Sequence, residues 1–324
     1  MRRVRYYEYG DPDVLTVEEA DIPEPGPGQM LIRAEAIGAN FVDTLIRRGP
    51  ASPPLFRRPL PGRPTGDVVG TVEAVGPGVG AELVGRRYAG TAEDAYAEYA
   101  VSDAEWAVPV PDGLDAAAAC MLPLAAPVAL GSLRHGRLAP GETVLVHAAA
   151  GGIGHHAVQL ARLLGAGTVI ATASSPARLD FARGYGADAG VDYSVEGWQD
   201  RVREVAPGGV DLVLDSVGGD VLLRSFDVLA PAGRVLVYGA ASGELGQIPV
   251  TSLFGLRSAI GFALYDWRAA APDRARAEQA EVAEWSAAGR LRTATAIRLP
   301  LTEAARAHVL LESRTHLGRV LLIP

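Results

Sequence analysis

A glycine-rich loop between a buried strand and a helix is the feature that most restricts what this chain can fold into. Apolar residues at 143–147 predict the strand, the loop reads Ala148-Ala-Ala-Gly151-Gly152-Ile153-Gly154, and 153–164 has helical spacing. A dinucleotide pyrophosphate needs free backbone N–H groups at a helix N-terminus and no Cβ in the way. Gly151, Gly152 and Gly154 meet both needs, and a tight structural turn is the alternative interpretation.

The segments that follow this loop alternate between strands and helices. Further strands are predicted at 168–172, 210–214 and 233–238, with helices at 176–185 and near 221–229. This alternation predicts βαβ units around a doubly wound parallel sheet, a Rossmann domain in an α/β protein.

The two ends of the chain have a different character. Short strands broken by Gly and Pro fill the first ~120 residues, for example 14–17, 30–34 and 68–72. The Ala-rich segment 115–130 predicts a helix that Pro123 and Pro127 break or kink. The tail predicts a charged amphipathic helix at 275–288, a helix at 302–313 and a final strand at 319–323. The length of 324 residues suits two domains.

Composition excludes several classes of chemistry. The net charge is −8, and basic residues gather only locally around 47–63, so we expect no nucleic-acid partner. That local patch suits a solvated rim or a phosphate-facing loop. Lysine is absent, which excludes Schiff-base, pyridoxal and P-loop lysine chemistry. Cys120 is the only cysteine, which excludes an intramolecular disulfide and a thiolate metal cluster.

Nothing in the sequence predicts membrane insertion or secretion. No apolar run reaches the ~18 residues of a spanning helix, and the first residues lack the apolar core of a signal peptide. We therefore expect a cytoplasmic protein without a membrane partner.

The end of the second strand indicates which dinucleotide binds. An NAD enzyme usually places Asp or Glu there to hold the ribose 2′-OH. Here Ser174 and Ser175 stand at that place, Arg178 follows, and the first acid, Asp180, falls one turn into the next helix. A neutral strand end with a nearby Arg suits the 2′-phosphate of NADP. A solvated helix residue is the alternative interpretation of Arg178.

Several segments together resemble the medium-chain dehydrogenase/reductase superfamily and, within it, the quinone oxidoreductase (zeta-crystallin-like) branch. They are the 40–49 segment Asn40-Phe-Val-Asp43-Thr-Leu-Ile-Arg47-Arg-Gly49, the coenzyme loop at 147–161, the loops at 215–219 and 238–243, and the tail from Leu311. The resemblance implies a β-rich GroES-like catalytic domain from 1–123 and 263–324, and a Rossmann domain from 124–262. It also implies bound NADPH, a small-molecule substrate, and a homodimer paired through the sheet edge near 248–264.

The resemblance also implies the site residues. Asn40, Asp43 and Asp67 are the catalytic candidates, with Asn40 as a polar contact near the nicotinamide and both acids as orienting groups rather than proton donors. The cofactor-binding candidates are Asn40, Pro127, Ala150, Gly151, Gly152, Ile153, Ser174, Arg178, Tyr193, Ser216, Val217, Tyr238, Gly239, Ala240, Phe262 and Arg314.

Zinc is where the resemblance to alcohol dehydrogenases ends. Asn40, Gly66 and Leu124 stand where those enzymes carry ligands, and none can ligate zinc in their manner. The adjacent His155 and His156 should point to different faces of their helix, as surface or cleft residues. We therefore expect no metal.

Without a metal to polarise a carbonyl, a conjugated acceptor suits the site better than an alcohol. The expected reaction is transfer of hydride or electrons from NADPH to a quinone. Leu45, Pro127 and Asp67 depart from the Tyr, Thr and Glu that relatives often carry, which favours a specialised enone or biosynthetic quinone. An enoyl or 2-alkenal double-bond reductase and a non-catalytic NADPH-binding protein are the alternatives.

Overall fold

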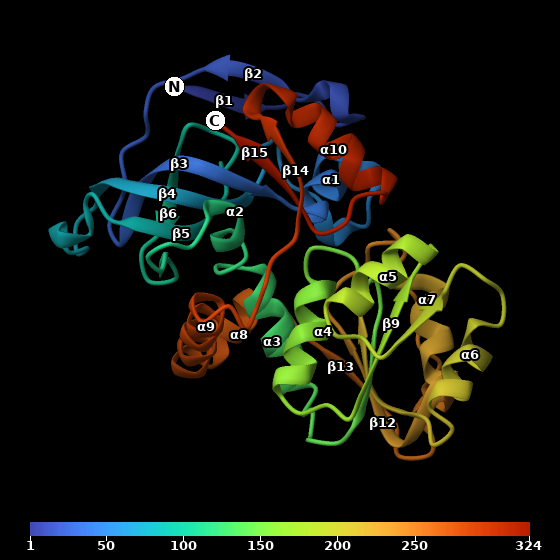
Figure 1. Ribbon diagram of the computed structural model, residues 1–324. Coiled ribbons are helices and arrows are strands. Elements are labelled where there is room, and N and C mark those ends of the chain that lie inside the picture. Colours follow the sequence, from blue (N-terminus) through green and yellow to red (C-terminus); the bar gives the residue numbers. More distant parts are fainter. The chain divides into compact units, whose positions relative to one another are not determined.

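The computed structural model describes all residues, 1–324, as two compact units (Figure 1). The first comprises Met1–Leu124 and Gln279–Pro324, and the second comprises Ala125–Glu278. The first boundary lies within one residue of the expected 123/124, whereas the second lies beyond the expected 262/263. No helix combines the length and the apolar character needed to traverse a bilayer.

The second unit is built on a six-stranded parallel sheet in the order β10-β9-β8-β11-β12-β13. The strands are β8 (Thr143–Val146), β9 (Thr168–Ala173), β10 (Ala189–Asp192), β11 (Val210–Asp215), β12 (Leu229–Val237) and β13 (Ser258–Gly261). The order reverses between β8 and β11, which is the doubly wound Rossmann arrangement. In such sheets the crevice at the carboxyl ends of the strands near the reversal receives the ligand.

Helices cover this sheet in two layers. They are α3 (Ala125–His135), α4 (Gly154–Leu163), α5 (Pro176–Gly184), α6 (Trp198–Val205) and α7 (Gly219–Ser225). The unit also contains α8 (Leu264–Ala270), which contacts α3, and the first part of α9 (Pro272–Ala287). His155 of α4 lies against Phe181 and Tyr185 of or beside α5, so these two helices share a face. Trp198 of α6 and Phe226 after α7 share one apolar cluster with buried strand residues. Burial on both faces explains why the strands are apolar throughout.

The first unit is built on a seven-stranded sheet. Its main path is β14-β15-β3-β4-β5-β7, with β6 paired to β3, and β1 and β2 form a separate ribbon. The strands are β1 (Arg2–Arg5), β2 (Thr16–Glu19), β3 (Gln29–Ala39), β4 (Gly66–Val75), β5 (Arg87–Ala92), β6 (Tyr99–Asp103), β7 (Val108–Pro109), β14 (Thr295–Pro300) and β15 (Arg319–Ile323). The helices are α1 (Phe41–Arg48), α2 (Ala116–Ala119) and α10 (Ala304–Ser313). Short 3-10 segments of this unit lie at Pro12–Val14, Gly49–Ala51, Pro54–Phe56, Ala81–Leu83 and Leu301–Glu303, and those of the second unit lie at Phe226–Val228 and Val250–Leu253.

Strand register explains why both ends of the chain belong to the first unit. Gly38 of β3 is the partner of Asp67 of β4 on one side and of Leu321 of β15 on the other. The end of β3, the start of β4 and the start of β15 therefore lie side by side.

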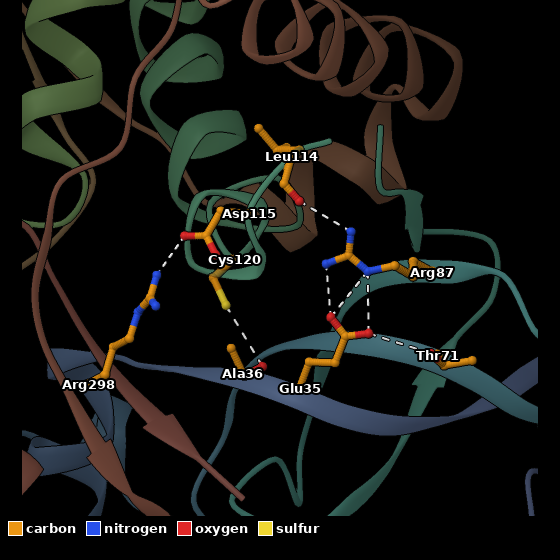
Figure 2. Close-up of polar contacts among 8 residues, drawn as sticks. All are labelled: Glu35, Ala36, Thr71, Arg87, Leu114, Asp115, Cys120 and Arg298. Atoms are coloured by element: carbon orange, nitrogen blue, oxygen red, sulfur yellow. Dashed lines mark hydrogen bonds and ion pairs between the residues drawn. The ribbon is translucent and has the colours of Figure 1, made fainter. Parts of the chain in front are cut away.

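Polar contacts tie the residues on both sides of α2 to this sheet, as Figure 2 shows. Arg87 of β5 donates to the Glu35 carboxylate, with Nη2 at 2.9 Å, and its Nη1 donates to the carbonyl of Leu114 at 3.2 Å. The Cys120 thiol lies 3.9 Å from the carbonyl oxygen of Ala36. The carboxylate of Asp115 pairs with Arg298 of β14 at 2.7 Å.

Three elements differ from the sequence-based expectation. The 115–130 helix is two helices, α2 and α3, separated around Pro123. Pro127 lies in the first turn of α3, where its missing N–H costs no helical hydrogen bond, so it does not break the helix. The strand expected at 14–17 begins at Thr16, and the helix expected near 221–229 ends at Ser225 because Leu229 already pairs with Val210 in the sheet.

Candidate functional site

The glycine loop of the second unit forms a tight turn from β8 into α4. A Cβ at Gly154 would lie 2.3 Å from the carbonyl oxygen of Ala148, so only glycine fits there. Ala148 itself has φ +48°, a left-handed conformation that is strained for a residue with a side chain. The N–H groups of Gly152 and Ile153, at the start of the helix, bond to no backbone acceptor. Free donors and a positive helix end fit a dinucleotide pyrophosphate.

His155 and His156 follow this loop directly, and our expectation for them was wrong. Both side chains are fully buried, and their ring centroids lie 3.9 Å apart rather than on different faces. Their Nδ1 atoms lie 2.7 and 2.9 Å from the carbonyl oxygens of Gly151 and Gly152. Because a carbonyl only accepts, each Nδ1 carries the proton. The two imidazoles therefore donate hydrogen bonds to the backbone of the glycine loop and stabilise its conformation.

The end of β9 carries the predicted 2′-phosphate site. Nη1 of Arg178 donates to Oγ of Ser174 at 2.9 Å, so both side chains lie together at the strand end. Tyr193 follows β10, and its backbone N–H donates to the carbonyl of Ala173 at 3.1 Å. The three predicted residues of this unit thus gather at one corner of the sheet, and no carboxylate partner is recorded for Arg178 there.

The loops after β11 and β12 lie side by side at the same edge. The backbone N–H of Ala241 donates to the carbonyl of Ser216 at 2.8 Å, and a Cβ at Gly239 would lie 3.1 Å from that same oxygen. Buried Asp215 shapes the first loop by accepting from the N–H groups of Val217 and Gly218 at 3.1 and 3.0 Å. Burial raises the pKa of Asp215 to about 6, while these two hydrogen bonds act in the opposite direction.

Other predicted cofactor residues of this unit are largely buried. Ala150 is 4% exposed, and Pro127 is buried in α3. The ring of Phe262 lies over α3, where a Cβ at Gly131 would meet it at 2.4 Å. Burial raises the pKa of Tyr238, at the end of β12, to about 12.

His147, at the end of β8, is a buried polar residue whose interactions were not anticipated. Ser225 Oγ donates to the carbonyl of Val221 at 2.7 Å, so it must accept from Nε2 of His147 at 2.8 Å. The Nδ1 atom then accepts from the hydroxyl of Thr172 at 2.7 Å. Burial alone lowers the pKa of His147 to about 3, so the ring is neutral. The signal for it in the sequence is one polar residue that ends an apolar strand.

Asn40, the only asparagine of the chain, stands between β3 and α1 in the first unit. Its side chain does not cap α1, which excludes the simplest structural role for it. Instead Nδ2 donates to Oδ2 of Asp67 at 3.4 Å. The second N–H of this amide is left for another acceptor, and the side chain is half-buried.

Asp67 is fully buried and pairs with Arg319 of β15, whose side chain is 3% exposed. Gly38 makes this pairing possible, because a Cβ there would lie 2.1 Å from Nη2 of Arg319. Sequence reasoning missed Arg319. The available signal is a single charge at the start of an otherwise apolar final strand.

Asp43 lies in α1 with both oxygens turned to Thr65, the residue before β4. Its Oδ1 accepts from the Thr65 N–H at 2.7 Å and from the Thr65 hydroxyl at 2.9 Å. Burial raises the pKa of Asp43 to about 7, partly offset by these hydrogen bonds. With its side chain buried, Asp43 fits the role of fixing the corner between α1 and β4.

Two arginines connect α1 to other parts of the first unit: Arg314 at the end of α10 and Arg47 of α1 itself. The guanidinium of Arg314, at the end of α10, lies 5.5 Å from the ring centroid of Phe41, next to Asn40. Arg47 is fully buried, donates through Nε to the carbonyl of Gly10 at 3.1 Å, and pairs with Glu312. Arg47, which belongs to the basic segment that we expected at the surface, therefore lies in the core of the first unit.

The residues present do not fit a zinc ion. No three His, Cys, Asp or Glu side chains of the chain converge, and the positions that the family resemblance assigns to zinc ligands carry Asn40, Gly66 and Leu124. Burial raises the pKa of the Cys120 thiol to about 12, which disfavours the thiolate that metal binding needs.

Comparisons with known proteins agree with this architecture. Residues 26–112 match the alcohol dehydrogenase GroES-like domain, and residues 152–280 match the zinc-binding dehydrogenase domain. A quinone oxidoreductase from Pseudomonas aeruginosa is 38% identical over 337 residues, covering 100% of this chain and 99% of the relative. A 2-haloacrylate reductase from Burkholderia sp is 36% identical over 330 residues, covering 98% and 97%.

Solved structures give the same result. A mycobacterial protein complexed with NADPH superposes with a TM-score of 0.93 and is 35% identical in sequence. Escherichia coli quinone oxidoreductase complexed with NADPH superposes with a TM-score of 0.90 and is 30% identical. Both comparisons cover 100% of each chain. The fold and these matches define an oxidoreductase of the medium-chain dehydrogenase/reductase class. Within that class, the chain belongs to the quinone oxidoreductase branch.

Proposed function

We propose that this protein is a zinc-independent reductase that uses NADPH to reduce a small conjugated acceptor, with a quinone as the first candidate. NADPH supplies a hydride from the nicotinamide ring when bound. In the second unit, the glycine loop would hold its pyrophosphate, and Ser174, Arg178 and Tyr193 would hold its 2′-phosphate. The NADPH-bound structural relatives support NADPH as the cofactor.

The observation that carries the proposal is the amide of Asn40. One of its N–H groups is directed to Asp67, which orients the other toward a further acceptor. Reduction of a conjugated carbonyl places negative charge on the carbonyl oxygen, and a positioned N–H donor stabilises that charge. A quinone or enone spreads the charge over its conjugated system, so an amide can suffice where an isolated carbonyl would need a metal.

The buried acids would position this amide rather than transfer protons. Arg319 balances the charge of Asp67, so the carboxylate does not oppose negative charge on the acceptor. Asp43 holds Thr65, two residues before Asp67, and fixes the start of β4. Both acids are 2% exposed or less, which agrees with an orienting role.

Two other functions remain alternatives. The likeness to a 2-haloacrylate reductase favours reduction of a carbon–carbon double bond in an enoyl or 2-alkenal acceptor. Buried Leu45 and Pro127 supply no hydroxyl where relatives often carry Tyr and Thr, which agrees with a specialised acceptor. A non-catalytic NADPH-binding protein would keep the second unit's features and need none of the Asn40 geometry.

The test is oxidation of NADPH and NADH against a panel of quinones and 2-alkenals, with and without a chelator. We expect NADPH-dependent turnover that a chelator leaves unchanged. The variant Asn40→Ala should lose about 100-fold in kcat. The matched control is Gln29→Ala, because that amide only accepts from the N–H of Gly26 in a turn. NADPH binding without turnover of any acceptor would favour the non-catalytic alternative, and loss of activity to the chelator would refute zinc independence.

We also propose that two copies pair through β13. This strand is an edge of the parallel sheet and pairs only with β12. Large apolar side chains stand exposed just before it, with Val250 at 73%, Phe254 at 69% and Leu256 at 82%. An open edge beside exposed apolar residues favours pairing with a second strand.

A further inference from the structure

The connection between α1 and β4 has an unusual charge. Between Asp43 and Asp67 the chain contains no Asp or Glu, yet it carries Arg47, Arg48, Arg57, Arg58 and Arg63. The whole chain has a net charge of −8, so this positive segment stands against the overall balance. We call residues 49–65 the arginine loop.

Only the first two of these arginines form an ion pair with an acid. Arg47 and Arg48 both pair with Glu312. Arg57, Arg58 and Arg63 are exposed, and none forms an ion pair. Nη1 of Arg58 donates only to carbonyl oxygens within the loop, those of Leu55 at 3.2 Å and Arg57 at 2.9 Å. Three positive charges therefore remain available to an anion from outside the chain.

The loop is held against the rest of the first unit. The hydroxyl of Tyr9 donates to the carbonyl of Arg58, and its ring fills the space where a Cβ at Gly49 would lie, 2.3 Å away. Gly62 exchanges two backbone hydrogen bonds with Tyr6, at 3.3 and 2.7 Å. These contacts limit the freedom of the loop, so less ordering is needed when a ligand binds to its side chains.

The loop also ends at the proposed acceptor site. Thr65, its last residue, is bonded to Asp43, and Asp67 accepts from Asn40. Arg63 stands four residues before Asp67, so their Cα atoms are at most about 14 Å apart even in an extended chain. The positive charge of the arginine loop therefore begins within about 14 Å of the residue that orients Asn40. Arg57 and Arg58 add further positive charge earlier in the same loop.

We propose that Arg57, Arg58 and Arg63 select an acceptor that carries an anionic group, a carboxylate or a phosphate, beside its conjugated bond. This inference rests on the proposed function and narrows its substrate class. A guanidinium binds either anion through two parallel hydrogen bonds, and an unscreened positive cluster also accelerates the encounter with an anionic ligand. A neutral acceptor gains from neither effect.

The test compares acceptors that share a conjugated group and differ in whether they carry an anionic group. The pairs are 2-chloroacrylate with its methyl ester, 1,2-naphthoquinone-4-sulfonate with 1,2-naphthoquinone, and crotonyl-CoA with the phosphate-free crotonyl-N-acetylcysteamine. The triple variant R57Q/R58Q/R63Q should lose at least about tenfold in kcat/KM for anionic acceptors and less than about twofold for their neutral partners. Preference for 2-chloroacrylate would identify a carboxylate, and preference for crotonyl-CoA would identify a phosphate.

A matched control removes the same charge elsewhere. The variant R183Q/R201Q/R203Q changes three exposed arginines of the second unit that each pair with a neighbouring acid. It should leave the ratio of anionic to neutral turnover unchanged. Equal losses in both triple variants, or wild-type turnover that favours neutral acceptors, would overturn the inference and leave the proposed function intact.

A second measurement does not depend on turnover. Binding of unreactive 2-chloropropionate and of coenzyme A to the NADPH-saturated protein is followed by calorimetry. At least about tenfold weaker binding of one anion by R57Q/R58Q/R63Q supports the inference even if no acceptor is reduced. Equal binding by both proteins, or no binding to the wild type, overturns it. Absence of turnover with every acceptor would instead count against the proposed function.

Discussion

The guanidinium of Arg319, near the C-terminus, is bonded to the carboxylate of Asp67, and both side chains are buried in the first unit. Asp67 in turn accepts from Asn40. A pair that is 252 residues apart in the chain thus holds the amide on which the proposed reaction depends.

This pairing predicts that removing Arg319 alone destabilises the protein and that removing Asp67 as well restores most of the lost stability. Arg319→Met leaves Asp67 buried without its cation and should destabilise the protein by about 3 to 5 kcal/mol. The double variant Asp67→Leu with Arg319→Met should recover most of that loss, because neither charge remains. Urea unfolding measures both, and a double variant no more stable than Arg319→Met would contradict the prediction.

The orientation of Asn40 can be observed separately. Because Asn40 is the only asparagine, selective ¹⁵N labelling of asparagine gives one side-chain amide signal pair in an NMR spectrum. The double variant Asp67→Leu with Arg319→Met, which adds no asparagine, should shift this pair and lower kcat more than it raises KM, since the donor is displaced rather than removed. An unmoved signal would show that Asp67 does not position Asn40.

Arg178 should decide the choice between NADPH and NADH. It lies on Ser174 at the end of β9, where no acid stands to bind a ribose hydroxyl. Arg178→Ala should raise KM for NADPH by about 10- to 100-fold and change KM for NADH little, because one charge-assisted contact to the 2′-phosphate is lost. Arg183→Ala is the control, since Arg183 lies on the same helix and pairs with Asp180. Equal effects of the two variants would remove Arg178 from the site.

The buried imidazole of His147 predicts a specific pH dependence. Its pKa is about 3 when folded, against about 6.5 unfolded, so the unfolded chain binds the extra proton. Its contribution to stability is present above pH ~6.5 and lost as pH falls toward 3, by about 2 kcal/mol between pH 6.5 and 5. The raised pKa values of Asp43 and Asp215 act with the opposite sign over part of this window.

A difference measurement isolates His147 from those acids. His147→Gln should be less stable than the wild type at pH 7, and the gap should narrow by about 2 kcal/mol by pH 5. Urea unfolding at pH 5, 6 and 7 measures the gap. A gap that stays constant with pH would show that His147 is not held neutral by burial.

The proposed pairing through the edge strand β13 predicts that a charge placed beside this strand weakens the dimer. Leu256→Asp places a charge on an 82% exposed apolar residue just before β13 and should shift a dimer toward monomers. Val195→Asp is the control, because Val195 is 58% exposed and lies after β10, at the opposite edge of the sheet. Light scattering after size exclusion separates the outcomes, and a monomeric wild type would refute the proposed pairing.

Much of the second unit follows from local sequence. The glycine loop, the apolar strands and the helical spacing around them are encoded within short windows, and βαβ units bring such windows to one sheet edge. Ser174 and Arg178 could be placed together because they are four residues apart at a strand end. Local sequence misplaced His155 and His156, because their burial depends on α5, which supplies Phe181 and packs against them.

By itself, the sequence determined the Rossmann and GroES-like classes, the glycine loop and the identity of Asn40, Asp43 and Asp67 as residues of interest. Only the tertiary structure decided what those residues contact. The strand β15 returns beside β3 and places Arg319 on Asp67, and the start of β4 brings Thr65 to Asp43. The tertiary structure also decided that Arg47 is buried whereas Arg57, Arg58 and Arg63 of the same segment are exposed. Burial and pairing of charges are set by contacts between distant segments, so no local pattern encodes them.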